Sequence, residues 1–202
     1  MNSGWTDPMA IATREFEAGK FDAALAALEA AEKSENWKAP AQDLRGSIYL
    51  EQQKWSEAAA AFEMAHATAP SFLSPRLHGA DLLLRQGKWE EARARYFEVM
   101  EETNVLIAHE QLRFGALLAS IAGKDEAAAS AALERLPFPT ESPAYYYGQA
   151  AWSYAHGNRS AGDKWLRTAQ EVFDARQTAW FARKLYDVGW IKKKPPLVVE
   201  TL

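Results

Sequence analysis

The chain has 202 residues, of which 48% are hydrophobic and 12% aromatic, enough for a domain with a buried core. Its net charge of −4 at pH 7 is opposite to the basic surface that nucleic acids and anionic membranes require. The absence of cysteine excludes disulfides, thiolate catalysis and cysteine-ligated zinc.

The start of the chain lacks the features of a targeting signal. Residues 1–10 have neither a basic lead nor an apolar core, so we predict no signal peptide. No apolar run approaches the roughly 18 residues of a membrane-spanning helix. We therefore expect a cytoplasmic protein by default, or a periplasmic or secreted one if a leader is removed before Met1.

A short pattern recurs along the chain at a fixed spacing. It appears as Gly19–Ala24, Lys54–Ala58 and Gly87–Ala92, with an aromatic residue at positions 21, 55 and 89, each 34 after the last. Two similar turns begin at Gly123 and Gly157, again 34 apart, after a two-residue insertion predicted around residues 104–108. Such a period indicates a stacked repeat protein.

Small residues occur at two positions of every repeat, where two helices would approach closely. The first set is Ala12, Gly46, Ala80, Ala116 and Ala150, and the second is Ala24, Ala58, Ala92, Ala128 and Gly162. Four residues beyond the second set come Leu28, Phe62, Tyr96, Ala132 and Leu166, the spacing of a buried helical stripe. The two sets predict helical hairpins packed against one another.

Period and residue types together resemble the tetratricopeptide repeat family over residues 5–175. The resemblance implies an all-α, right-handed superhelical solenoid of antiparallel helix pairs. We expect one solenoid over residues 5–190, with units starting near 5, 39, 73, 109 and 143. A last helix, 177–189, would cap the array, making eleven helices, and residues 191–202 would form a basic, proline-containing stop and a tail.

Local signals support these boundaries. Asp-Pro or Ser-Pro pairs, an N-cap residue followed by proline, mark predicted helix starts at Asp7-Pro8, Ser74-Pro75 and Ser142-Pro143. Glycines that favour a left-handed cap end the first helices at Gly19, Gly87, Gly123 and Gly157. Two tryptophans, Trp55 and Trp89, are predicted to fill the interfaces between units.

In this family the first helices line a concave groove in which ligands bind. Transfer of those positions gives a candidate peptide-binding groove: Thr13, Glu17, Asp43, Ser47, Glu51, Asp81, Arg85, Arg113, Leu117, Tyr147 and Tyr154. The groove would be acidic at its N-terminal end, carry Arg85 and Arg113 centrally, and be aromatic at its C-terminal end. For the Tyr145–Tyr147 cluster two interpretations remain: Tyr146 in the core with flanking neighbours, or Tyr147 and Tyr154 as an aromatic shelf for a ligand.

One subclass of the family does not fit. Its co-chaperones hold acidic tails with a clamp of Lys, Asn, Asn, Lys and Arg, whereas the matching positions here are Met9, Thr13, Leu44, Ser74 and His78. We therefore do not expect an acidic-tail chaperone adaptor.

The resemblance implies a protein–protein interaction scaffold or adaptor that binds an extended peptide or helix of another protein. The alternative is a structural assembly subunit acting through its ends, its convex face or self-association at Trp190 and Ile191, with the groove empty or filled by its own tail. We expect no enzyme, cofactor or metal, because the sequence has no nucleophile, metal or phosphate motif and no paired histidines.

Overall fold

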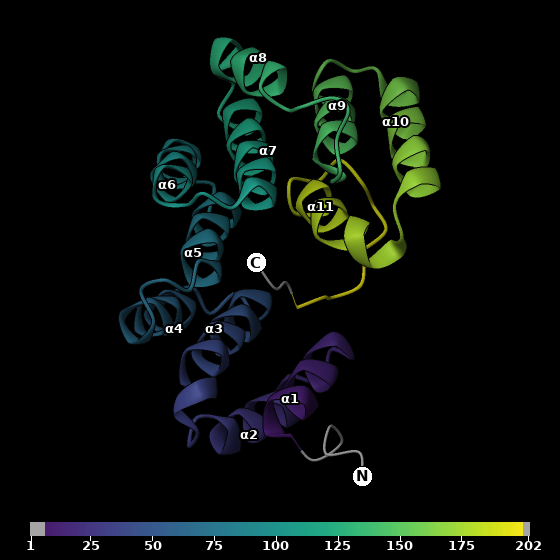
Figure 1. Cartoon of the computed structure of the whole chain (residues 1–202). Coiled ribbons are helices and arrows are strands. Elements are labelled where there is room, and N and C mark those ends of the chain that lie inside the picture. The colour runs from purple at the N-terminus through teal and green to yellow at the C-terminus, as the bar shows by residue number, and fades with distance from the viewer. Residues whose placement is uncertain (1–6, 200–202) are drawn as a thin grey trace. The chain divides into compact units, whose positions relative to one another are not determined.

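The computed structural model describes residues 7–199, and within that range every regular element is a helix (Figure 1). The helices are α1 (Pro8–Glu17), α2 (Phe21–Ala31), α3 (Glu35–Glu51), α4 (Trp55–Thr68), α5 (Ser74–Arg85), α6 (Trp89–Glu102), α7 (Leu106–Ala122), α8 (Glu126–Glu134), α9 (Ala144–Ala155), α10 (Arg159–Val172) and α11 (Ala175–Asp187). The predicted all-α class is confirmed.

The helices pack as the repeat pattern predicts. Short turns join α1 to α2, α3 to α4, α7 to α8 and α9 to α10, and each of these pairs packs together. A second helix also packs on the next first helix, as α2 does on α3 and α8 on α9. This solenoid-type stacking buries the apolar face that one hairpin cannot bury alone.

The described residues form two compact units, 7–82 with 197–199 and 83–196, referred to below as unit 1 and unit 2. The boundary falls within α5. One continuous array over 5–190 therefore stays a prediction, and its expected start at residue 5 and the last three tail residues lie outside the described range.

The predicted small residues lie where helices approach closely. All ten are buried except Ala128, which is half-buried. A Cβ on Gly46 would lie 2.4 Å from Cε1 of Phe62, and one on Gly162 would lie 2.4 Å from Cε1 of Tyr154. Because each aromatic ring rests directly on a glycine backbone, the small residue is a packing requirement of the hairpin.

Some helix boundaries differ from prediction. Helix α3 begins at Glu35 rather than near 39 and continues through Pro40, which has no N–H to donate to the helix. Helix α7 begins at Leu106 rather than near 109, so part of the expected insertion is helical. Helix α11 begins at Ala175 because the side chain of Asp174 accepts from the backbone of Gln177 in a capping box.

The turns also correct one expectation. Gly19, Gly87 and Gly157 adopt positive φ, but Gly123 has φ −76° and Lys124 takes the left-handed conformation instead. Gly123 is constrained by space, because a Cβ there would lie 3.2 Å from the Cβ of Trp89. Trp89 and the equivalent Trp55 are half-buried at the first residues of α6 and α4, where Trp55 packs against the cluster of Leu50, Phe62 and Leu82 and Trp89 lies against Gly123 at the end of α7.

Candidate functional site

The first helices of unit 1 carry two carboxylates at equivalent repeat positions. Glu17 on α1 and Glu51 on α3 are 34 residues apart and half-buried, and α1 packs beside α3. Thr13 and Ser47 form a second equivalent pair, also half-buried, and Ser47 donates its hydroxyl to the Asp43 carbonyl. We call these four residues, Thr13, Glu17, Ser47 and Glu51, the acidic face.

The other two predicted acids of unit 1 are inside the protein. Asp43 and Asp81 are 6% and 2% exposed. Asp43 Oδ1 lies 2.8 Å from Nδ1 of His78 on α5, and the His78 ring packs against Phe62 with centroids 5.5 Å apart. Asp43 therefore joins two first helices and does not present its carboxylate to solvent.

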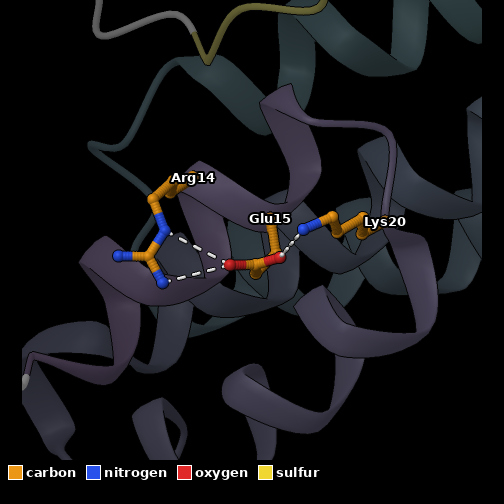
Figure 2. Close-up of polar contacts among 3 residues, drawn as sticks. All are labelled: Arg14, Glu15 and Lys20. Atoms are coloured by element: carbon orange, nitrogen blue, oxygen red, sulfur yellow. Dashed lines mark hydrogen bonds and ion pairs between the residues drawn. The ribbon is translucent and has the colours of Figure 1, made fainter.

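Glu15, the other carboxylate on α1, is neutralised by its neighbours (Figure 2). Glu15 Oε1 accepts from Nε and Nη2 of Arg14 at 3.2 and 3.0 Å, and Oε2 lies 3.5 Å from Nζ of Lys20. The hydrogen bonds from Arg14 hold the pKa of Glu15 below its ordinary value, and Lys20 acts in the same direction. The two cations leave Glu15 contributing little net charge beside Glu17.

The C-terminal tail contacts the face of α1 that carries Glu17. The backbone N–H of Val199 donates to Oε1 of Glu17 at 3.2 Å. Leu197 and Val199 pack against the buried cluster of α1–α3, which includes Met9 and Phe16. Part of the predicted groove in unit 1 is thus covered by the chain itself.

In unit 2, α11 covers the first-helix face. Its Asp187 forms an ion pair with Arg85 of α5. The ring centroid of its Phe181 lies 5.2 Å from that of Phe114 on α7 and 5.6 Å from that of Tyr147 on α9. The Arg85 side chain is only 12% exposed. The helix predicted to cap the array therefore lies against α5, α7 and α9, on the side where the repeat pattern predicts a ligand.

The predicted aromatic end of the groove is core. Leu117 is fully buried and Tyr147 is 1% exposed, and this burial raises the pKa of Tyr147 to about 12. Tyr146, by contrast, is half-buried beside Trp165 and Phe173. The core interpretation is therefore wrong in naming Tyr146, because the buried tyrosine of this cluster is Tyr147.

The remaining candidates are partly exposed. Tyr154 packs its ring on Gly162 and donates its hydroxyl to Asp163 Oδ1 at 2.7 Å, and burial with that carboxylate raises its pKa. Arg113 is half-buried on α7. Trp190 and Ile191 are half-buried, and both donate N–H groups to the carbonyl of Leu185.

Over residues 7–199 the histidine and acidic side chains form no group of three or more that could hold a metal ion. Within the same residues no helix is both long and apolar enough to cross a membrane.

Comparison with known proteins agrees with this architecture. A tetratricopeptide repeat-like domain family matches residues 9–75. The fold is similar to the crystal structure of a tetratricopeptide repeat protein from Parabacteroides merdae, with a TM-score of 0.57 and 17% identity, over 94% of this chain and 75% of that one. Comparison with curated proteins gave no match. The sequence of residues 9–75 thus resembles this repeat-like domain family, and the structural match shows that the fold is similar to that of a tetratricopeptide repeat protein.

Proposed function

We propose that this protein is a non-catalytic interaction scaffold that binds an extended segment of another protein on the acidic face of unit 1. Tetratricopeptide-like folds generally mediate protein–protein interactions. The observation that carries the proposal is the pair Glu17 and Glu51, two half-buried carboxylates at the same repeat position of adjacent first helices. In unit 2 the corresponding side is occupied by α11.

The geometry of the face defines the chemistry of the partner. Packed helices lie about 8–10 Å apart, so equivalent carboxylates on neighbouring first helices are separated by roughly that distance. An extended chain rises about 3.3 Å per residue, and three residues span about 10 Å. The partner segment should therefore carry two lysines or arginines three residues apart.

Selection from a random peptide library tests the proposal. The bait is the full chain as wild type and as Glu17→Lys/Glu51→Lys. A matched control, Glu29→Lys/Glu63→Lys, makes the same charge change at exposed positions on the second helices α2 and α4. Wild type and control should enrich peptides with paired basic residues, and the first variant should lose them. Identical enrichment by all three proteins would refute the proposal.

The alternative of an assembly subunit is supported by a different observation. Because α11 and the tail contact first-helix faces, the ends and outer surfaces would remain for partners. Light scattering of wild type and Trp190→Ser/Ile191→Ser distinguishes the two. Concentration-dependent oligomers that disappear in the variant would favour the assembly subunit, and a monomer at all concentrations would favour the scaffold.

A further inference from the structure

The tail segment Leu197–Val199 has the form of a docked peptide. It belongs to no helix or strand, and its first and third residues both pack against the α1–α3 cluster, as alternate residues of an extended chain do. The backbone N–H of Val199, the last residue of the segment, donates a hydrogen bond to Glu17. The hydrogen bond to Glu17 and the packing of Leu197 and Val199 against the α1–α3 cluster hold the segment on unit 1.

The tail segment is not part of the helical repeats. Residues 83–196 belong to unit 2, whereas residues 197–199 belong to unit 1. Pro195 and Pro196 precede it and favour an extended backbone that cannot continue α11. Helices α1–α3 have their own buried cluster of nine residues, including Ala12, Leu28 and Ile48, to which the tail adds only partly buried side chains.

We infer that the surface holding the tail, formed by Glu17 and the α1–α3 cluster and called the α1 site below, is a docking site for an extended segment of a partner. That segment would carry two branched aliphatic residues at alternate positions, and the tail would compete with it for the site. The inference rests on the proposed function and adds the apolar half of the partner's pattern. The tail also carries basic residues, because Lys192–Lys194 precede its aliphatic residues with Pro195 and Pro196 between them. A partner of the same pattern would donate an N–H to Glu17 and replace Leu197 and Val199.

The contact between the tail and unit 1 is small enough for a partner to displace the tail. Leu197 and Val199 are half-buried, and the polar part of the contact is the hydrogen bond from the Val199 N–H to Glu17. A tethered ligand acts at an effective concentration in the millimolar range, so even a weak contact competes with a partner present at micromolar concentration. The attached tail should therefore weaken binding in trans without abolishing it.

The test uses the full chain and a fluorescein-labelled peptide with the sequence of residues 192–199, followed by anisotropy. The receptors are wild type, the tail variant Leu197→Ser/Val199→Ser, and the control Val172→Ser, which changes an exposed aliphatic residue on α10. The tail variant should bind the peptide at least about tenfold more tightly than wild type or control. Adding Glu17→Ala to the tail variant should weaken binding about tenfold, because a hydrogen bond to a charged acceptor is lost.

Three results would overturn the inference: equal affinity for wild type and tail variant, no binding to either, or equal binding of a peptide with serine at the two aliphatic positions. A wild-type dimer that disappears in the tail variant would also overturn it, since the tail would then dock on a second copy. Cooperative melting of every variant excludes loss of folding as the cause. The library selection uses foreign sequences and the anisotropy measurement uses the tail peptide. If only the library selection fails, the binding of the tail peptide still stands and the proposed function is refuted.

Discussion

Asp187 near the end of α11 lies beside Arg85 at the end of α5, with 3.9 Å between its Oδ2 and the guanidinium Nε. Both side chains are nearly buried, and Asp187 also accepts from Nε of Arg183 at 3.3 Å. This pair joins α11, the last helix of unit 2, to the end of α5, where unit 2 begins. It helps hold α11 on the first-helix face.

We predict that Arg85 and Asp187 are energetically coupled. A double-mutant cycle with Arg85→Gln and Asp187→Asn, measured by urea unfolding, should give a coupling free energy of about 0.5–3 kcal/mol. The exposed pair Arg95 and Glu98, 3.2 Å apart within α6, provides the control and should couple by less than about 0.5 kcal/mol. Additive effects at Arg85 and Asp187 would mean that the pair does not hold α11.

Glycine-to-alanine changes should have opposite signs at two helical positions of unit 1. Gly46→Ala places a methyl against the buried Phe62 ring and should lower the free energy of unfolding by about 1–3 kcal/mol. Gly79→Ala meets no atom within 4 Å and should raise it by about 0.5–1 kcal/mol through helix propensity. Chemical denaturation checks both, and a stabilised Gly46→Ala protein would disprove the close approach of α3 and α4.

The aromatic contact of α11 should dominate the stability of unit 2. Phe114 is fully buried and contacts Tyr147, Trp180 and Phe181, so Phe114→Ala should cost about 3–5 kcal/mol. Phe138→Ala, at a side chain 64% exposed, should change stability by no more than about 1 kcal/mol. Equal midpoint shifts in urea for the two variants would contradict the placement of α11.

The repeat itself can be predicted from the sequence because its physical requirements are local. A hairpin whose helices approach closely needs a small residue at the crossing, so the residue type and spacing of Gly46 and Gly162 are enough to locate it. The turns at Gly19, Gly87 and Gly157 need a positive φ, which favours glycine, so the residue type again marks the position in the repeat. These requirements recur every 34 residues, and their agreement predicts the fold class.

The faces that stay open cannot be predicted in this way. Repeat positions identify which residues point to the first-helix side, but not what else packs there. The repeat pattern places Tyr147 and Arg85 on that side, yet α11 covers both. The docking of α11 and of Val199 depends on contacts between segments distant in sequence, for which a 34-residue period carries no signal.

The His156 contact should respond to pH. Its Nδ1 lies 2.8 Å from the carbonyl of Trp152 and its Nε2 lies 2.7 Å from Oε1 of Glu126, so two acceptors favour the doubly protonated ring. The carbonyl of Trp152 and then Glu126 raise the pKa of His156. Because the folded pKa is raised, the stabilisation is fully present below the ordinary histidine value and is lost as pH rises through the folded pKa.

An NMR titration of His156 checks this expectation. Its pKa should lie above the ordinary histidine value in wild type and fall in Glu126→Gln. The melting midpoint of wild type should exceed that of Glu126→Gln at about pH 5.5, and the difference should shrink by about pH 8.5. An unchanged titration in the variant would show that the α8–α9 contact is not made.

Solvent exchange of the Val199 amide, followed while a library-selected peptide is added to the wild-type chain, tests most directly whether a partner takes the place of the tail on α1. The N–H of Val199 is held by Glu17, so a partner that takes the α1 site must release it. We predict that saturating peptide accelerates exchange of this amide at least about tenfold, while amides within α11 are unchanged. A peptide that binds tightly and leaves Val199 exchange unaltered would place the binding surface elsewhere and contradict docking of the partner at Glu17.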